Sequence, residues 1–94
     1  MFHVHKITAD TVSSDAYLNG SVFVADCTGG DVRLTLSTLA NTGTTLFAKK
    51  EDNSSNAFIL DGDSVLVDGC EEIEITIQNE AYMIVRSDDG WEIV

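Results

Sequence analysis

Basic residues and long apolar runs are scarce in this sequence, and each scarcity excludes a class of partner. Lys and Arg number 5 against 16 Asp and Glu in 94 residues, which gives a formal net charge of -11 at pH 7. Nucleic-acid phosphates and anionic membrane surfaces both attract basic patches, so we expect this acidic chain to bind neither. No apolar run approaches the roughly 20 residues that cross a bilayer. The segment 1–6 lacks the long apolar stretch of a secretory signal.

Cysteine, proline and aromatic residues are also few. The sequence has 2 cysteines, no proline, and aromatic side chains at 7% of its positions. Cys27 and Cys70 lie too far apart in the chain for the short spacing of a metal-ligand pair or a redox motif. A disulfide between them stays open from the sequence. The simpler interpretation is two small, partly buried thiols in a protein made in a reducing cytosol.

The length predicts a single domain spanning residues 1–94. Hydrophobic residues make up 44% of the chain and charged residues 22%, which is ordinary for a globular protein. Surface scaling predicts that a chain of this size buries about 64% of its surface on folding. That fraction is enough for one modest hydrophobic core.

Apolar residues alternate with polar ones at a period of two along most of the chain. The clearest case is Ile73, Ile75 and Ile77, which are separated by single polar residues. Such short runs predict strands, and no window shows the i, i+3, i+4 stripe of an amphipathic helix. We expect strands within residues 2–7, 21–25, 32–36, 45–49, 57–60, 64–67, 73–77, 81–85 and 91–94.

Glycine-containing turn signals separate these runs. They are Asn19-Gly20, Gly29-Gly30, Asn41-Thr42-Gly43, Asp61-Gly62, Asp68-Gly69 and Asp89-Gly90. Their spacing predicts an all-β fold, a small antiparallel β-sandwich or barrel-like domain of about eight to nine short strands. We expect the polar segment 50–56 to be a hairpin tip at most, and Ser37–Asn41 could make one helical turn. Segments 58–63 and 65–70 echo each other, but two units are too few to predict a solenoid, so consecutive hairpins are favoured.

Residues 32–94 carry an ordered series of short motifs. In chain order these are Lys49-Lys50, Asp52, Ser54, Asn56, Phe58–Leu60, Asp61-Gly62, Val67-Asp68-Gly69, Ile73, Ile75, Ile77, Tyr82, Ile84-Val85, Ser87-Asp88-Asp89-Gly90 and Trp91. This part of the chain resembles a small β module of tailed-bacteriophage virion proteins. The module is known near the ends of tail fibres and spikes and in capsid-attached fibres.

Three positions depart from the pattern of that module. Ser37-Thr38 stands where the module has proline, Cys70 replaces a small polar residue, and Gly90 is followed by Trp91 without the usual spacer. The segment 1–31 matches no part of the module. We expect it to be an anchoring or docking part, whose Phe2 and Val4 add an edge strand to a partner.

The resemblance implies a non-enzymatic, trimer-forming virion component that is made in the host cytoplasm. A short chain without a fibre shaft favours a trimeric capsid decoration (cement) protein, which binds the major capsid protein on the capsid surface and stabilises the head. One alternative is a tail-fibre or tail-knob component, or a receptor-binding module that contacts the host surface. Another is a small β binding domain of a cellular protein. We expect no catalytic, cofactor-binding or metal-binding residue.

Two histidines near the N-terminus are a weak metal candidate. His3 and His5 fall on one face of a strand, about 6.6 Å apart. In a trimer, three such strands could offer their imidazoles to a metal on the axis. The favoured alternative is a pair of exposed or interface histidines on an edge strand.

Acidic residues gather at three places without the spacing of a calcium loop. Asp61-Gly62-Asp63 and Asp88-Asp89 could collect calcium, a cation that prefers six to eight oxygens. We favour turn residues whose carboxylates cap backbone amides. Glu71, Glu72 and Glu74 are expected to form a solvated rim.

The two large aromatic residues, Trp91 and Tyr82, are expected to pack in the core or at a subunit interface. The alternative is an exposed Trp91 that stacks on a sugar, with Asp88 and Asp89 accepting hydrogen bonds from the sugar hydroxyls. Deep burial of Trp91 would exclude this alternative.

Because acidic copies repel one another, we expect several cations in paired positions near subunit or capsid contacts. The cations are Lys6, Arg33, Lys49, Lys50 and Arg86.

Overall fold

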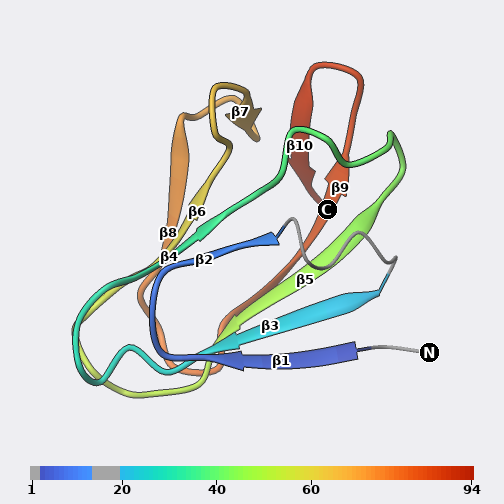
Figure 1. Ribbon diagram of the computed structural model, residues 1–94. Helices are drawn as coiled ribbons and strands as arrows, with labels where there is room; N and C mark the ends of the chain where they lie inside the picture. Colours follow the sequence, from blue (N-terminus) through green and yellow to red (C-terminus); the bar gives the residue numbers. More distant parts are fainter. Residues whose placement is uncertain (1–2, 14–19) are drawn as a thin grey trace.

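The computed structural model describes residues 3–13 and 20–94, and within them the regular structure is all-β, as the sequence predicts (Figure 1). Phe2 of the expected first strand and Asn19 of the first turn signal lie outside these ranges. Every expected strand position holds a strand, and β2 was not expected. The ten strands are β1 (His3–Ile7), β2 (Thr11–Val12), β3 (Ser21–Ala25), β4 (Val32–Thr35), β5 (Thr45–Lys50), β6 (Phe58–Asp61), β7 (Leu66–Val67), β8 (Glu72–Ile75), β9 (Ala81–Arg86) and β10 (Gly90–Ile93).

The strands form two sheets, and the first three strands of each sheet are parallel. Sheet A has six strands in the order β1-β3-β5-β9-β10-β7, and sheet B has four in the order β2-β4-β6-β8. Neighbours pair in parallel from β1 to β3 to β5 and from β2 to β4 to β6. The chain therefore crosses from sheet A to sheet B in three successive coils, β1–β2, β3–β4 and β5–β6, which stack as in a β-solenoid (Figure 1).

The prediction of an antiparallel sandwich or barrel is thus wrong for the coiled part. The alternation of apolar residues reports which face a side chain occupies, but not the direction of the neighbouring strand. A connection that crosses to the other sheet has the same polar, glycine-rich composition as one that reverses the chain. Parallel pairing follows here because each connection crosses over.

Antiparallel strands cover one end of the stack. β8 pairs with β6, β9 pairs with β5, and β10 pairs with β9. β7 then pairs in parallel with β10. At the opposite end, β1 and β2 are the edge strands of the two sheets.

The core lies between the two sheets and follows the alternation in the sequence. Every second residue of β3 and β5 points inward, so that Phe23, Leu46 and Ala48 are buried. Strands of sheet B contribute Leu34 and Phe58 from the other side. Each large apolar side chain buried in this way stabilises the fold by about 1.5–3 kcal/mol.

Three local expectations need correction. The segment 50–56 is not a hairpin tip, because it forms the corner that joins β5 of sheet A to β6 of sheet B. Ser37–Asn41 makes a turn in which the Ala40 N–H donates to the Ser37 carbonyl at 3.3 Å, not a helical turn. The echoing segments 58–63 and 65–70 are not consecutive hairpins, since β6 and β7 belong to different sheets.

Candidate functional site

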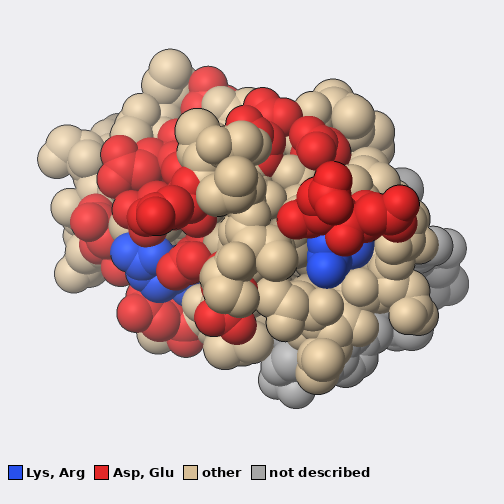
Figure 2. Space-filling view, turned by 90° about the horizontal axis from the view of Figure 1, so that it is seen from above, with Lys and Arg blue, Asp and Glu red and all other residues tan. Residues whose placement is uncertain are grey.

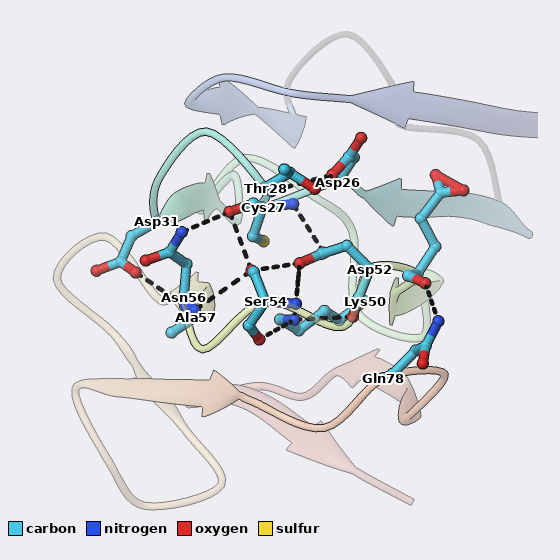
Figure 3. A network of polar contacts seen from close by, with 11 residues as sticks. Asp26, Cys27, Thr28, Asp31, Lys50, Asp52, Ser54, Asn56, Ala57 and Gln78 are labelled. Carbon is cyan, nitrogen blue, oxygen red and sulfur yellow. Dashed lines mark hydrogen bonds and ion pairs between the residues drawn. The ribbon is translucent and has the colours of Figure 1, made fainter.

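The Asp-x-Ser-x-Asn loop that contributes to the resemblance lies at the corner between β5 and β6, around a buried lysine (Figure 3). Lys50 is the last residue of β5 and its side chain is fully buried. Its ammonium donates hydrogen bonds to the Asp52 carbonyl, to Asp52 Oδ2 and to the Ser54 carbonyl, each at 2.9 Å. All three N–H groups of the ammonium are therefore used inside the corner.

The same loop binds the corner of the preceding coil. Asp52 Oδ1 accepts a hydrogen bond from the Cys27 N–H at 2.8 Å, and Asn56 Nδ2 donates to the Cys27 carbonyl at 2.8 Å. The Ser54 hydroxyl contacts both Asp52 Oδ2 and the Cys27 carbonyl. Side chains of the third coil thus satisfy the backbone of the second coil at the point where it leaves sheet A.

The charges of this corner network are fixed by its contacts. Burial by itself raises the pKa of Asp52, but hydrogen bonds from the Cys27 N–H, from Ser54 and from Lys50 outweigh burial and hold this pKa well below its ordinary value. Burial, with the nearby charge of Asp52, raises the pKa of the Cys27 thiol. Lys50 and Asp52 therefore form a buried ion pair whose contacts are structural, beside a neutral cysteine.

Both cysteines are free, with Cys27 buried and Cys70 exposed. The interpretation of two unpaired thiols is therefore confirmed, although only Cys27 is buried.

The acidic turns make ordinary protein contacts. Asp61 Oδ1 accepts a hydrogen bond from the Asp63 N–H at 2.9 Å, which confirms the turn interpretation at this site. Asp61 and Glu72 also bind the guanidinium of Arg33 at 2.7 and 2.6 Å. In residues 3–13 and 20–94, no group of three or more His, Cys, Asp or Glu side chains is placed to hold a metal.

The glutamates Glu71, Glu72 and Glu74 are exposed, as a solvated rim requires. Asp88 accepts a hydrogen bond from the Thr42 hydroxyl at 3.2 Å.

The two histidines lie on β1, an edge strand of sheet A, as their favoured interpretation predicts. His3 is exposed, and the half-buried His5 ring stacks on Phe23 with 5.1 Å between ring centroids. The weaker alternative, a metal shared between copies at this strand, is not tested by a single chain.

Trp91 is deeply buried, at 1% exposure, so the interpretation of a sugar-stacking tryptophan is wrong. It packs in the core cluster, and the guanidinium of Arg86 lies over its ring at 6.0 Å from the centroid. Arg86 also donates to the carbonyls of Ser87 and Gly90, which fixes the turn between β9 and β10. Tyr82 is half-buried and packs against the same core.

The expectation that several cations are paired is confirmed, whereas their placement near subunit or capsid contacts stays a prediction. Lys50 and Arg33 form the ion pairs above, and Lys6 lies 3.5 Å from Glu51. Lys49 differs, because its side chain makes no hydrogen bond or ion pair with any described residue. In the view from above, Asp and Glu gather in groups around the few Lys and Arg, with uncharged surface between the groups (Figure 2).

The two sheets present different outer faces. Residues that alternate with the buried positions point outward, and in sheet B these include Arg33, Asp61, Glu72 and Glu74. The outer face of sheet A is mostly apolar instead. It includes Val4, Lys6, Val22, Val24, Thr45, Phe47, Lys49, Leu66, Ala81, Met83, Val85 and Glu92.

One row of this face is apolar across four strands. The register places Val4 of β1 beside Val22 of β3, Phe47 of β5 and Met83 of β9. We call these four residues the apolar row. Val4 is 60% exposed and Met83 is 37% exposed. A hollow of about 220 Å³ includes two residues of the row, and it is lined by Val22, Phe47, Ala48, Lys49 and Ala81.

Neither a scan of protein-family models nor a search of curated proteins finds a match to this chain. Where the chain is described, it also has no helix of the length and apolarity needed to cross a bilayer. The candidate site is therefore defined by geometry alone: a structural corner around Lys50 and a largely apolar outer face on sheet A.

The burial of Lys50 is the feature that the sequence analysis missed. The signal was present, because Leu46, Ala48 and Lys50 share the parity of the buried side of their strand. A lysine at such a position is ordinarily taken as exposed. Only Asp52 and the two carbonyls, brought together by the corner, make its burial favourable.

Proposed function

We propose that this chain is a non-enzymatic structural protein of a bacteriophage virion, and specifically a trimeric capsid decoration (cement) protein that stabilises the head. The single observation that carries the proposal is the mostly apolar outer face of sheet A on a chain of net charge -11. Exposed apolar patches of this kind mark surfaces that bind other proteins. A protein that binds copies of itself and a capsid shell needs an exposed surface of this kind.

The rest of the molecule fits a scaffold that holds this face rigid. The coils stack through backbone pairing, and the Lys50 corner fixes the second coil to the third. Motif residues shared with the phage module thus support the shape of the sheet, which explains in physical terms why a structural module would contain them. Each 100 Å² of apolar surface that such a face buries against a partner contributes about 2.5 kcal/mol before the costs of association.

In this role the protein acts by clamping neighbouring capsid subunits. Sheet B, with its exposed carboxylates, would face solvent and limit clumping of particles. The clamp adds contacts between capsomers that are lost only when the shell ruptures. The partner is therefore the major capsid protein, together with other copies of this chain.

The proposal is tested on particles with and without the protein. Particles that lack it should rupture at lower temperature and under milder osmotic shock than particles to which the purified protein has been added back. Equal rupture of both preparations would contradict the cement role.

The copy number per particle separates the head from the tail. Hundreds of copies fit a decoration protein, whereas a few copies fit the alternative, a tail-fibre or tail-knob component or receptor-binding module. The resemblance to modules at fibre ends still supports that alternative. Its candidate sugar-binding residue is excluded, however, because Trp91 is buried.

A further inference from the structure

We infer that the outer face of sheet A is the surface by which copies of this chain bind each other, with Lys49 of one copy paired to Glu92 of the next. The inference rests on the proposed assembly of identical copies and names the contact that makes it. The observations behind it are the apolar row, the distribution of charge over the face, and the Lys49 ammonium, which no described residue binds.

The charge of the chain favours this face for contacts between copies. Two strongly acidic molecules repel one another unless their contact is poor in acid. The outward positions of the sheet A face contain one acid, Glu92, and two of the five bases, Lys6 and Lys49. The outer face of sheet B carries Asp61, Glu72 and Glu74 among its outward positions. Repulsion between two copies is therefore smallest where sheet A meets sheet A.

Lys49 and Glu92 occupy opposite ends of the face. Lys49 of β5 pairs with Ala81 of β9, and Glu92 of β10 pairs with Val85 of β9. Lys49 and Glu92 are therefore separated by four residues along the strands and by two strand spacings across the sheet. At about 3.3 Å per residue and about 4.8 Å per strand, the two Cα positions are roughly 16 Å apart. They cannot bind each other within one copy. Neither side chain makes a hydrogen bond or ion pair with another described residue.

Opposite charges at opposite ends of one face match a head-to-tail arrangement. In such an arrangement each copy is related to the next by the same rotation. The Glu92 end of the second copy then lies against the Lys49 end of the first copy. Repeated contacts of this type form a ring when the rotation between copies closes, and the proposed trimer is such a ring with three members. The apolar rows then face the ring axis, where Val4 and Met83 lose their contact with water.

Charge reversal on the full-length chain tests this contact. Lys49→Glu and Glu92→Lys should each raise the dissociation constant of the assembly by about tenfold or more, because each sets like charges against each other. The double variant K49E/E92K restores opposite charges and should return the constant to near the wild-type value. Sedimentation velocity over a dilution series measures all four proteins.

Glu92→Lys is the most informative variant, and Glu74→Lys is its matched control. Both replace an exposed acid by a base and lower the net negative charge equally, so general repulsion falls in both. E74K, on the outer face of sheet B, should associate at least as strongly as the wild type. A weaker association of E92K alone can come only from a local contact of Glu92.

Three results would overturn the inference. The first is a wild-type chain that stays monomeric throughout the dilution series. The second is an E92K variant that associates as strongly as E74K, and the third is a K49E/E92K variant that remains as weak as the single variants. Circular dichroism of each variant shows that a lost assembly does not reflect a lost fold.

The inference and the proposed function fail in different ways. Oligomers with the expected charge dependence that are absent from phage particles would contradict the virion role and leave the contact intact. Monomers found in hundreds of copies on a phage head would contradict the contact and leave the virion role intact.

Discussion

At the scale of single residues, Lys50 determines the shape of the corner between β5 and β6. A lysine is placed at an inward position of a strand, which is costly unless its ammonium is fully bonded. Asp52 supplies the opposite charge, and the carbonyls of Asp52 and Ser54 supply the remaining acceptors. The loop must therefore wrap around the ammonium, and this geometry turns the chain from sheet A to sheet B.

We predict that Lys50→Met strongly destabilises the fold. The variant leaves the buried Asp52 carboxylate without its cation, and breaking a buried ion pair from one side typically costs about 3–5 kcal/mol. Urea unfolding at a fixed protein concentration measures the loss. Lys6→Met is the control, because the Lys6 side chain is 72% exposed and its contact with Glu51 is long. A loss below about 1 kcal/mol for K50M would contradict the role of Lys50.

The Asp52 carboxyl predicts a specific pH dependence. Its pKa is lower in the folded chain than in the unfolded chain, so its contribution to stability is present above the ordinary pKa of Asp, about 3.9, and is lost as the pH falls through the folded-state value. Asp52→Asn lacks this titration. The difference in unfolding free energy between the wild type and D52N should therefore shrink as the pH is lowered from about 5 to about 2. A difference that stays constant over this range would contradict the assignment.

At the scale of strands and turns, the sequence predicts where the strands lie along the chain, but it does not predict which strands pair with each other. β3 occupies the predicted residues 21–25, β5 extends one residue beyond its predicted range, and β10 is shifted by one residue from its predicted range. The period of two identifies each strand and its buried side. It does not state whether the next strand lies in the same sheet, and β2, with two residues, is too short to show any period. The mostly parallel, solenoid-like order therefore emerged only from the structure.

A second element-scale feature is the tight turn after β6, which predicts an effect of Gly62. A Cβ at Gly62 would lie 1.9 Å from the Val65 carbonyl oxygen, so Gly62→Ala forces the backbone apart and should cost about 1–3 kcal/mol or more. Gly29 has no positive φ and no atom within 4 Å of a built Cβ. Gly29→Ala should be neutral or stabilising by up to about 1 kcal/mol. Thermal unfolding compares the two, and equal melting temperatures would refute the turn argument.

At the scale of the whole molecule, the two sheets have outer faces of different chemical character. Sheet B has exposed carboxylates, and sheet A offers an apolar row flanked by Lys49 at one end and Glu92 at the other. This difference could not be predicted from the sequence, because it depends on which strands share a sheet. The net charge could be counted, but its placement around the apolar face follows only from the register of five strands.

The most direct measurement is an electron cryomicroscopy reconstruction of phage particles that carry this chain. We predict copies grouped in threes on the head, with the outer face of sheet A turned toward the neighbouring copy and the carboxylates of sheet B turned to solvent. Copies that stand singly with Val4 and Met83 open to solvent, or particles that lack the chain altogether, would contradict the account.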